Sequence, residues 1–506
     1  MKTRTLMVMG TASDVGKSVV VAGLCRLFSR AGIRVAPFKA QNMSNNAAIC
    51  NGGGEIGRAQ AAQAEACGLE PDADMNPVLL KPESDHRCQV VIAGQARFRM
   101  TTNEYSHYRE HAWPAIVNSY TRLAQRFELI LIEGAGGAAE INLRDRDIVN
   151  WPIAELADAR VLIIADIDKG GALASLVGTI ALLSEAERKR VKGLIINKFR
   201  GNLALLYGGL KIIEANTGVS ILGVLPYAGN LEIPEEDGAG LGISVSTQSG
   251  QPIKIAVIAF PRIANYTDFQ PFLNEPDVAL KYVNRPEHSG EADVLFLPGT
   301  KSTIADLIWL QKSGWEQRIR DHYAAGGTVA GICGGYQMLG ERIGDPEHCE
   351  SDLSSIAGLR LLPIKTIFAK EKITARVEAT HLDSGLTVSG YEIHCGRLTR
   401  CGCNPVFHIR MREGQGTAED EGAVTEDRRI FGTSIHGLFD SPQFRRHFLN
   451  QIRTHKGLAP LAIARAEDAR TLRGRAYDRF ASIISEHLDL NALAKLAGVA
   501  PDRLRA

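Results

Sequence analysis

The chain of 506 residues carries 58 basic and 57 acidic residues, so its net charge of +1 argues against a nucleic-acid-binding surface. No apolar run in the sequence reaches the roughly 18 residues that span a bilayer, which argues against a membrane protein. With 45% apolar residues the chain can bury the cores of two or three domains, and its nine scattered cysteines predict reduced thiols in the cytoplasm.

Short apolar, β-branched runs alternate with longer helical patterns through the first half of the chain. Strands that are buried on both faces have this composition, so the alternation predicts an α/β fold with a parallel sheet covered by helices on both sides. The pattern fades in the polar, glycine-rich stretch 236–252, which we interpret as a linker after a first domain of residues 1–235. The strands expected in this domain are 5–10, 33–40, 127–137, 159–171, 191–199 and 220–227.

Apolar runs resume after the linker and predict a second α/β domain over residues 253–445. The last segment, 446–506, has helical periodicity and is predicted to be a helical C-terminal extension. We expect helices at 441–455 and 476–498. The strands expected in the second domain are 253–260, 278–283, 292–300, 326–335 and 428–440.

The stretch "GTASDVGKS", residues 10–18, follows the first predicted strand and opens a predicted helix, which is the context of a phosphate-binding loop. Backbone N–H groups of such a loop surround the phosphates, the lysine reaches the terminal phosphates, and the serine hydroxyl binds Mg²⁺. The spacing departs from the standard motif because Thr11 stands where the first glycine is expected, so an ordinary strand-to-helix turn is the alternative. The loop residues assigned to ATP are Thr11, Asp14, Val15, Gly16, Lys17 and Ser18.

This loop, with its Gly-Thr start, resembles the dethiobiotin synthetase branch of phosphate-loop enzymes, which phosphorylate a carboxylate-type oxygen with ATP. The resemblance implies three further residues at strand ends. It assigns phosphate binding to Lys39 in "PFKAQNMS", metal binding to Glu133 in "LILIEGAGG" and adenine contact to Asn197 in "LIINKFRG". Taken singly, Glu133 also fits an ordinary acid at a strand end, and Asn197 also fits a turn residue. Their joint occurrence at the carboxyl ends of strands favours the ligand edge of the sheet.

Two acidic clusters follow predicted strands in the first domain. Asp145 and Asp147 lie in "NLRDRDIVN", and Asp166 and Asp168 lie in "ADIDKGG". Solvated loops explain both clusters equally well, while the functional interpretation is a contact with metal or substrate. We assign Asp145 and Asp147 to the acceptor substrate as a hypothesis.

In the second domain, "GICGG" places Cys333 between a predicted strand and a predicted helix. Small neighbours allow a strained turn that exposes the side chain, and N–H groups at the helix start lower the pKa of a thiol and bind an oxyanion. A buried, inert thiol is the alternative. The pattern predicts that Cys333 is a nucleophile, with Gly334 at its oxyanion site.

Together with "SIHGLFD" and "LFLPGTKST", this elbow resembles class I glutamine amidotransferases, which hydrolyse glutamine to glutamate and ammonia. The resemblance implies that His436 is the base and that the Gly299 loop supplies a second oxyanion N–H. The usual third group of that family, a glutamate two residues after the histidine, is Leu438 here. Glu392 in "GYEIHCG" is a conceivable substitute, although a glutamate on a strand face is the simpler interpretation.

Three families fuse a phosphate-loop synthetase to an amidotransferase: CTP synthase, cobyrinic acid a,c-diamide synthase and cobyric acid synthase. The chain most resembles the cobyric acid synthase family, over essentially its whole length. The motifs that carry this resemblance are "GTASDVGKS", "FKAQNMSNNA", "EGAGGAAEINLRDRDIVN", "ADIDKGG", "INKFRG", "PRIANYTDFQP", "LPGTKST", "GICGGYQML", "GYEIHCG" and "SIHGLFD".

The resemblance implies ATP- and glutamine-dependent amidation of the b, d, e and g carboxylates of cobyrinic acid a,c-diamide, with ATP and Mg²⁺ as cofactors. The implied partners are glutamine and a corrinoid, with no nucleic acid and no membrane, and a homodimer is a possible assembly. A sister enzyme with another acceptor is the first alternative. A non-enzymatic, partition-type phosphate-loop switch is the second.

Overall fold

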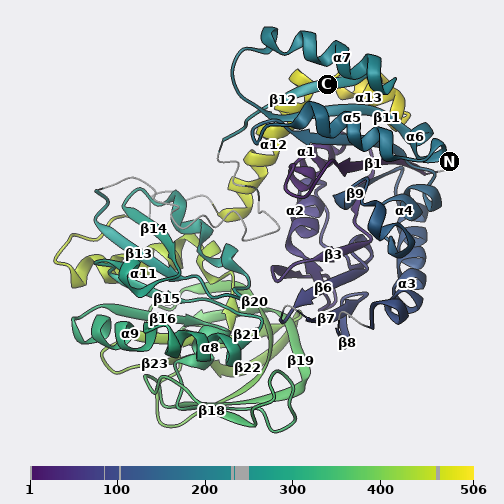
Figure 1. Cartoon of the computed structure of the whole chain (residues 1–506). Coiled ribbons are helices and arrows are strands. Elements are labelled where there is room, and N and C mark those ends of the chain that lie inside the picture. Colours follow the sequence, from purple (N-terminus) through teal and green to yellow (C-terminus); the bar gives the residue numbers. More distant parts are fainter. Residues whose placement is uncertain are drawn as a thin grey trace.

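The computed structural model describes residues 3–84, 86–101, 104–229, 233, 250–462 and 468–505. Figure 1 shows two α/β lobes, the first purple to teal and the second teal to green. Residues 236–249, most of the predicted linker, lie outside the described residues. Among the helices of the described part, none has the length and apolar character that a bilayer crossing requires.

A parallel six-stranded sheet forms the centre of the first lobe, in the order β12-β11-β10-β1-β9-β2. Apolar residues on both of its faces are buried, which explains why its strands are apolar throughout instead of alternating. All six predicted strands are present, and the predicted parallel α/β fold is confirmed. Their bounds are β1 Arg4–Gly10, β2 Val35–Phe38, β9 Leu129–Gly137, β10 Arg160–Asp166, β11 Val191–Phe199 and β12 Ile221–Pro226.

Helices pack on both faces of this sheet. Helix α1 begins directly after the glycine loop and packs on β9 and β2, so the loop lies at the carboxyl edge of the sheet. Short 3-10 turns η1 (Ala73–Met75), η3 (Ile141–Arg146) and η4 (Leu203–Leu205) join the other elements. The helices are α1 Lys17–Arg30, α2 Arg58–Ala66, α3 Tyr105–Arg126, α4 Trp151–Leu156, α5 Ala172–Leu182, α6 Glu185–Arg190 and α7 Tyr207–Thr217.

A small set of strands between β2 and α3 was not predicted from the sequence. Its strands are short, and several carry buried polar residues, so they lack the apolar runs that identify the central sheet. The four-stranded part has the order β3-β6-β7-β8, and β4 pairs with β5. The bounds are β3 Gln41–Met43, β4 Ala47–Ile49, β5 Glu55–Gly57, β6 Val78–Pro82, β7 Arg87–Ile92 and β8 Gln95–Thr101.

The second lobe contains a six-stranded sheet in the order β14-β13-β15-β16-β24-β23, parallel except for its last strand. Its strands are β13 Ile253–Ile258, β14 Val278–Val283, β15 Val294–Leu297, β16 Thr328–Ile332, β23 Ala423–Val424 and β24 Ile430–Thr433. The 3-10 segments η6 (Tyr266–Asn274), η7 (Pro286–Ser289) and η8 (Leu438–Asp440) connect these elements. Its helices are α8 Thr303–Lys312, α9 Trp315–Ala324, α10 Gly334–Met338 and α11 Pro442–His455.

A second, largely antiparallel sheet completes this lobe, with the order β18-β17-β19-β20-β25; β21 pairs with β19, and β22 pairs with β21. Its two long strands, β19 and β20, extend toward the first lobe (Figure 1). Strand β25 carries His436 and pairs with β20. The bounds are β17 Arg342–Gly344, β18 Ser355–Ala357, β19 Ile364–His381, β20 Thr387–Arg400, β21 Phe407–Arg412, β22 Gln415–Glu421 and β25 Ile435–His436.

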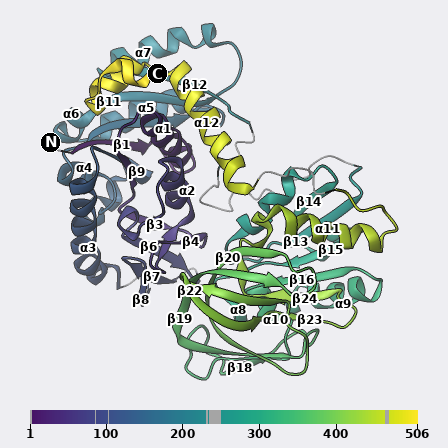
Figure 2. The ribbon, with the colours of Figure 1, turned by 180° about the vertical axis from the view of Figure 1, so that it is seen from behind.

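The C-terminal helices return to the first lobe, where Figure 2 shows them in yellow beside α1 and β12. Helix α12 (Ala469–His487) packs along α1, and α13 (Leu490–Ala497) packs near β1, before a final 3-10 turn η9 (Pro501–Leu504). Phe480 and Ile484 are buried in the core of the first lobe. The predicted helix 476–498 is therefore two helices, because Leu488 is extended and Asp489 caps the second.

The two lobes meet through a small apolar cluster and several ion pairs. The side chain of Ile393 on β20 is buried among apolar residues of the first lobe. Lys372 on β19 lies 2.5 Å from Glu55, and Lys301 lies 2.9 Å from Glu83. Burial opposes ionisation of Glu55, but Lys372 and Lys81 outweigh it and lower its pKa to about 2. A buried carboxylate that is paired in this way ties the lobes together at neutral pH.

Candidate functional site

The glycine loop joins β1 to α1 and presents Lys17 at the sheet edge. Lys17 is buried, and its Nζ donates to the carbonyl oxygens of Ala12 at 2.9 Å and Gly136 at 3.0 Å. Gly16 has φ of +94°, and a side chain there would collide with Asn197. The ammonium group therefore lies between the carboxyl ends of β1 and β9, where the predicted phosphate site requires it.

Glu133 ends the apolar part of β9 and is the centre of a buried polar cluster. Its Oε1 accepts hydrogen bonds from Ser18 Oγ at 2.8 Å and Lys39 Nζ at 2.9 Å. Its Oε2 accepts from Gln63 Nε2 at 2.5 Å and from Gln60 Nε2 at 3.3 Å. Burial by itself would raise the pKa of Glu133, but the charge of Lys39 and these hydrogen bonds lower it. The structure thus brings two other predicted site residues, Ser18 and Lys39, to the Glu133 carboxylate.

These residues fit the demands of Mg²⁺, which prefers hard oxygen ligands and keeps several waters. The Ser18 hydroxyl and the ionised Glu133 carboxylate lie side by side at the loop. Glu133 is one of the metal ligands expected from the sequence, and Ser18 is the other. Lys39 forms a buried ion pair with Glu133 at 2.9 Å, and its contact with a phosphate stays a prediction. The metal roles themselves stay predictions.

Asn197 and its neighbour hold the loop from strand β11. Asn197 Nδ2 donates to the Val15 carbonyl at 2.9 Å, and Lys198 Nζ donates to the Asp14 carbonyl at 2.8 Å. Lys198 also pairs with Asp166 at 2.8 Å. Asn197 thus lies at the loop, as expected, and the adenine contact predicted for it remains a prediction.

The acidic residues assigned to the acceptor lie on an exposed turn between β9 and α4. Asp147 accepts backbone hydrogen bonds from Val149, Asn150 and Trp151 at 2.8 to 3.0 Å, so its carboxylate holds the start of α4. Asp145 is exposed within η3. The contact of either carboxylate with an acceptor stays a prediction.

Cys333 occupies the turn between β16 and α10 in a strained conformation, with φ of 51° and ψ of −109°. Such a backbone costs about 1–3 kcal/mol in a non-glycine residue and persists only where its surroundings enforce it. Here the Cys333 N–H donates to Thr433 O at 2.8 Å, and a side chain at Gly335 would collide with the Leu297 carbonyl. The elbow predicted from the sequence is therefore present.

His436 is held by Asp268, which no sequence pattern indicated. His436 Nδ1 lies 2.7 Å from Asp268 Oδ2, and Asp268 Oδ1 accepts the Gly437 N–H at 2.9 Å. A carboxylate at Nδ1 fixes the proton there and leaves Nε2 to act on the thiol. Glu392, the substitute considered from the sequence, instead accepts a hydrogen bond from Arg412 at 3.0 Å.

The environment favours an ion pair between the thiol and the imidazole. Burial alone would raise the pKa of Cys333, but the charge and hydrogen bond of His436 lower it below the usual range. Burial would lower the pKa of His436, but Asp268 and Cys333 outweigh it and raise the pKa to about 10. A thiolate beside an imidazolium is the reactive form of a cysteine nucleophile.

The two loops predicted to form an oxyanion site lie together at this cysteine. A Cβ at Gly299 would lie 3.0 Å from His436 Cε1, and a Cβ at Gly334 would lie 3.2 Å from the backbone N of Thr300. A side chain at Gly299 would crowd the imidazole, and one at Gly334 would crowd the loop that carries Gly299. Backbone N–H groups at such a position can stabilise a developing oxyanion, and this role of the two loops stays a prediction.

Comparisons with known proteins agree with this geometry. Residues 6–239 match the model of a CobQ/CobB/MinD/ParA nucleotide binding domain, and residues 254–444 match that of a CobB/CobQ-like glutamine amidotransferase domain. A cobyric acid synthase from Citrobacter koseri is 46% identical over 503 residues, covering 97% of this chain and 98% of that protein. One from Klebsiella pneumoniae is 47% identical over 502 residues, with 97% of each chain covered.

The chain belongs to the cobyric acid synthase family. Membership confirms the resemblance found from the sequence and makes the protein a glutamine-dependent amidotransferase ligase. The second lobe carries an assembled Cys333–His436–Asp268 site, and this argues against the alternative of a non-enzymatic, partition-type switch. Asp268, the carboxylate at His436, lies in "PRIANYTDFQP", one of the motifs that carry the resemblance to this family.

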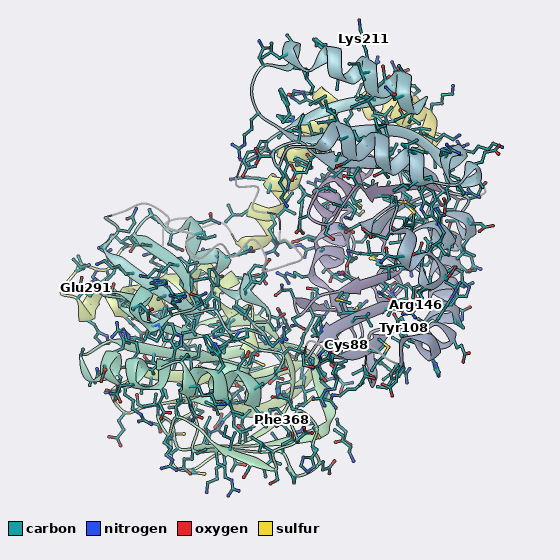
Figure 3. The ribbon with its side chains drawn as sticks, in the orientation of Figure 1. Cys88, Tyr108, Arg146, Lys211, Glu291 and Phe368 are labelled. Carbon is teal, nitrogen blue, oxygen red and sulfur yellow. The ribbon has the colours of Figure 1, made fainter. Side chains whose placement is uncertain are left out.

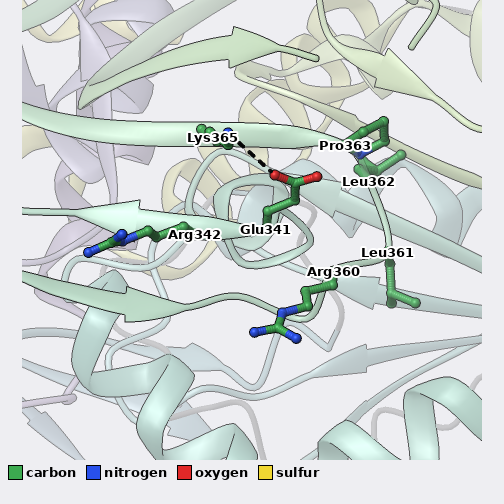
Figure 4. Close-up of a pocket in the computed structure, with 7 residues that line it drawn as sticks. All are labelled: Glu341, Arg342, Arg360, Leu361, Leu362, Pro363 and Lys365. Atoms are coloured by element: carbon green, nitrogen blue, oxygen red, sulfur yellow. Dashed lines mark ion pairs between the residues drawn. The ribbon is translucent and has the colours of Figure 1, made fainter. Parts of the chain in front are cut away.

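Of two cavities in the described part of the second lobe, one lies beside a residue that contacts Cys333. One, of about 180 Å³, is lined by Glu392 and His394, which flank Ile393, whose carbonyl lies 3.6 Å from Cys333 Sγ. The other, of about 450 Å³, is bordered by Arg342, Arg360 and Lys365 near β17 and contains none of the predicted site residues (Figure 4). The smaller cavity thus adjoins a residue that contacts Cys333, although Cys333 itself does not line it.

Replacing Asp268 by asparagine is expected to lower glutaminase activity by about 100-fold or more. The Gly437 N–H would fix the amide oxygen, so the amide NH₂ would face Nδ1 of His436 and impose the tautomer that protonates Nε2. That tautomer cannot take the thiol proton. Glutamate release measures the loss, and ammonia-dependent amidation should persist as evidence of a folded protein. Near wild-type glutamate release would show that Asp268 does not orient the histidine.

Proposed function

We propose that the protein amidates the b, d, e and g carboxylates of cobyrinic acid a,c-diamide, using one ATP and one glutamine for each amide. The observation that carries this proposal is the pairing, in one chain of this family, of a phosphate loop with a Cys333–His436–Asp268 site. A carboxylate is a poor acylating agent, so one site must activate it while the other supplies nitrogen. ATP use and glutamine use follow from these two sites.

In the second lobe, the Cys333 thiolate attacks the side-chain carboxamide carbon of glutamine. The oxyanion that forms is stabilised by backbone N–H groups of the Gly299 and Gly334 loops. His436, protonated at Nε2 and held at Nδ1 by Asp268, gives its proton to the leaving nitrogen, which departs as ammonia. A water molecule, deprotonated by the same histidine, then hydrolyses the thioester to glutamate and restores the thiol.

The 180 Å³ cavity beside Ile393 is suited to the two charged groups of glutamine. Its lining includes the carboxylates of Glu392 and Glu421, which can pair with an α-ammonium group. Arg397 also lines it, and its guanidinium donates to the carbonyls of Cys395 and Glu371, with no ion-pair partner among the described residues. An arginine in this state can bind the α-carboxylate in bidentate geometry.

In the first lobe, Lys17 and Lys39 bind the phosphates of ATP and neutralise charge as the terminal phosphoryl group moves to the acceptor carboxylate. Ser18 and Glu133 would hold Mg²⁺, which supplies further charge neutralisation when bound. The product of this step is an acyl phosphate and ADP. Ammonia then displaces the phosphate and leaves the amide.

Mass spectrometry of the corrinoid after incubation with ATP and glutamine tests this proposal. We expect four successive replacements of acid by amide, each matched by one ADP and one glutamate released. Cobyrinic acid a,c-diamide is the probe, and cobyrinic acid itself distinguishes the sister a,c-diamide synthase. A single amidation, or none, would overturn the substrate assignment while leaving the glutaminase site intact.

A further inference from the structure

A segment of the first lobe, residues 42–47 ("NMSNNA"), reaches the glutaminase site of the second. We call it the Asn-rich segment. The backbone N–H of Ala47, at its end, donates to Asn265 Oδ1 at 3.0 Å. The Ala47 carbonyl accepts from the Tyr391 hydroxyl at 3.5 Å. One peptide segment of the synthetase lobe is thus bound on both sides by residues of the amidotransferase lobe.

Both of these residues contact the catalytic histidine. Asn265 Nδ2 lies 3.4 Å from His436 Nε2, and the Tyr391 ring stacks on the imidazole with centroids 5.2 Å apart. Asn265 is buried and has φ of 52°, a left-handed conformation that asparagine tolerates better than most residues. It directly precedes η6, the segment that carries Asp268.

The contact with Ala47 decides which end of the Asn265 amide meets the histidine. Because the Ala47 N–H is a donor, it must face the amide oxygen, and the amide NH₂ then faces His436 Nε2. Asp268 keeps the other ring proton on Nδ1, so Nε2 of the neutral ring is an acceptor. The same atom must take the proton of Cys333. Asn265 therefore competes with the thiol for Nε2 and opposes the imidazolium that the charges of Asp268 and Cys333 favour.

The other end of the Asn-rich segment is connected to the predicted nucleotide site. Asn42 Nδ2 donates to Gln60 Oε1 at 2.7 Å, and Gln60 Nε2 lies 3.3 Å from Glu133 Oε2. The Asn46 carbonyl accepts the Arg58 N–H at 3.0 Å, at the start of the helix that carries Gln60. Hydrogen bonds thus connect the Glu133 cluster to the segment that holds Asn265.

We propose that Asn265 is a positioning residue through which the synthetase lobe restrains His436. In the arrangement seen here the Asn-rich segment turns the Asn265 amide toward Nε2 and keeps glutamine hydrolysis slow. When ATP and the acceptor occupy the first lobe, the segment shifts, Asn265 releases Nε2, and the histidine becomes free to act on Cys333. This inference rests on the proposed function and explains how ammonia release would wait for an activated acceptor.

The variant Asn265→Gly tests the restraint, because glycine keeps the left-handed backbone while removing the amide. We expect glutamate release without ATP and acceptor to rise several-fold. The stimulation produced by ATP with cobyrinic acid a,c-diamide should fall toward onefold. Alkylation of Cys333 by iodoacetamide should extend to lower pH in the variant, since an unhindered Nε2 stabilises the thiolate. A purely structural role would not produce this change in the pH profile.

Asn51→Ala is the matched control, because Asn51 also bridges the lobes, through Arg376 at 2.9 Å, on an exposed part of the interface. It should keep wild-type basal rates and wild-type stimulation. Unchanged basal hydrolysis and an unchanged alkylation profile in Asn265→Gly, or an equal effect in Asn51→Ala, would overturn the inference. Basal glutamate release and alkylation need no corrinoid. If the proposed acceptor is wrong, only the stimulation of the wild type is lost, so a failure of the proposed function can be distinguished from a failure of this inference.

Discussion

Replacement of Cys333 by alanine is expected to reduce glutamine-dependent amidation by roughly 10⁴-fold or more, while ammonia-dependent amidation continues. The loss follows because the thiolate forms the covalent intermediate, and the strained elbow presents no other nucleophile beside His436. The synthetase site lies in the other lobe and needs only ammonia, so a high ammonium concentration at mildly alkaline pH should restore product. Amide formation with each nitrogen source, measured in parallel, gives the comparison.

Cys401→Ala is the matched control for this experiment. Cys401 lies in the same lobe, directly after β20, and its thiol is exposed whereas that of Cys333 is buried. The control should retain both activities. Glutamine-driven turnover that survived in Cys333→Ala would refute the assignment of the nucleophile.

Replacement of Lys17 by alanine is expected to remove amidation from both nitrogen sources, by about 10³-fold. The buried ammonium group lies between the ends of β1 and β9 and is the charged group that we assign to a terminal phosphate. Without this ammonium group, the negative charge on the phosphoryl oxygens during transfer is no longer neutralised by Lys17. The assay is ADP release and amide formation with ammonium as the nitrogen source. Basal glutamate release should remain, because the Cys333 site is intact.

Lys211→Ala provides the matched control. Lys211 lies on α7, and Figure 3 shows its side chain directed outward from the first lobe. This variant should match the wild type in ADP release and in amidation. If Lys17→Ala kept ammonia-dependent product formation, the phosphate-binding role of the glycine loop would be wrong.

Much of the architecture could be predicted from the sequence because its central strands are buried on both faces. Strands such as Arg160–Asp166 are continuous apolar runs that end in polar residues, and those ends mark the ligand edge. The elbow at Cys333 was predictable for a different reason. A cysteine flanked by glycines between a strand and a helix indicates a strained turn, and few functions other than nucleophilic catalysis require such a turn.

The remaining parts depend on contacts that leave no local pattern. Asp268 precedes His436 by 168 residues, and no spacing rule connects a 3-10 segment to a histidine on another strand. The short strands between β2 and α3 carry buried asparagines and glutamines, whose partners come from distant elements. Helix α12 has an ordinary amphipathic sequence, which does not tell which lobe it will cover.

The return of α12 and α13 to the first lobe has a consequence for how the molecule is made. The apolar face of α1 is covered by residues such as Phe480 and Ile484, which follow the amidotransferase lobe in the chain. The synthetase lobe therefore cannot close its core until the whole amidotransferase lobe has been translated. A nascent or truncated chain would carry a glutaminase without a finished ligase, never a ligase alone, so the cell obtains the ATP-consuming half only together with its nitrogen supply.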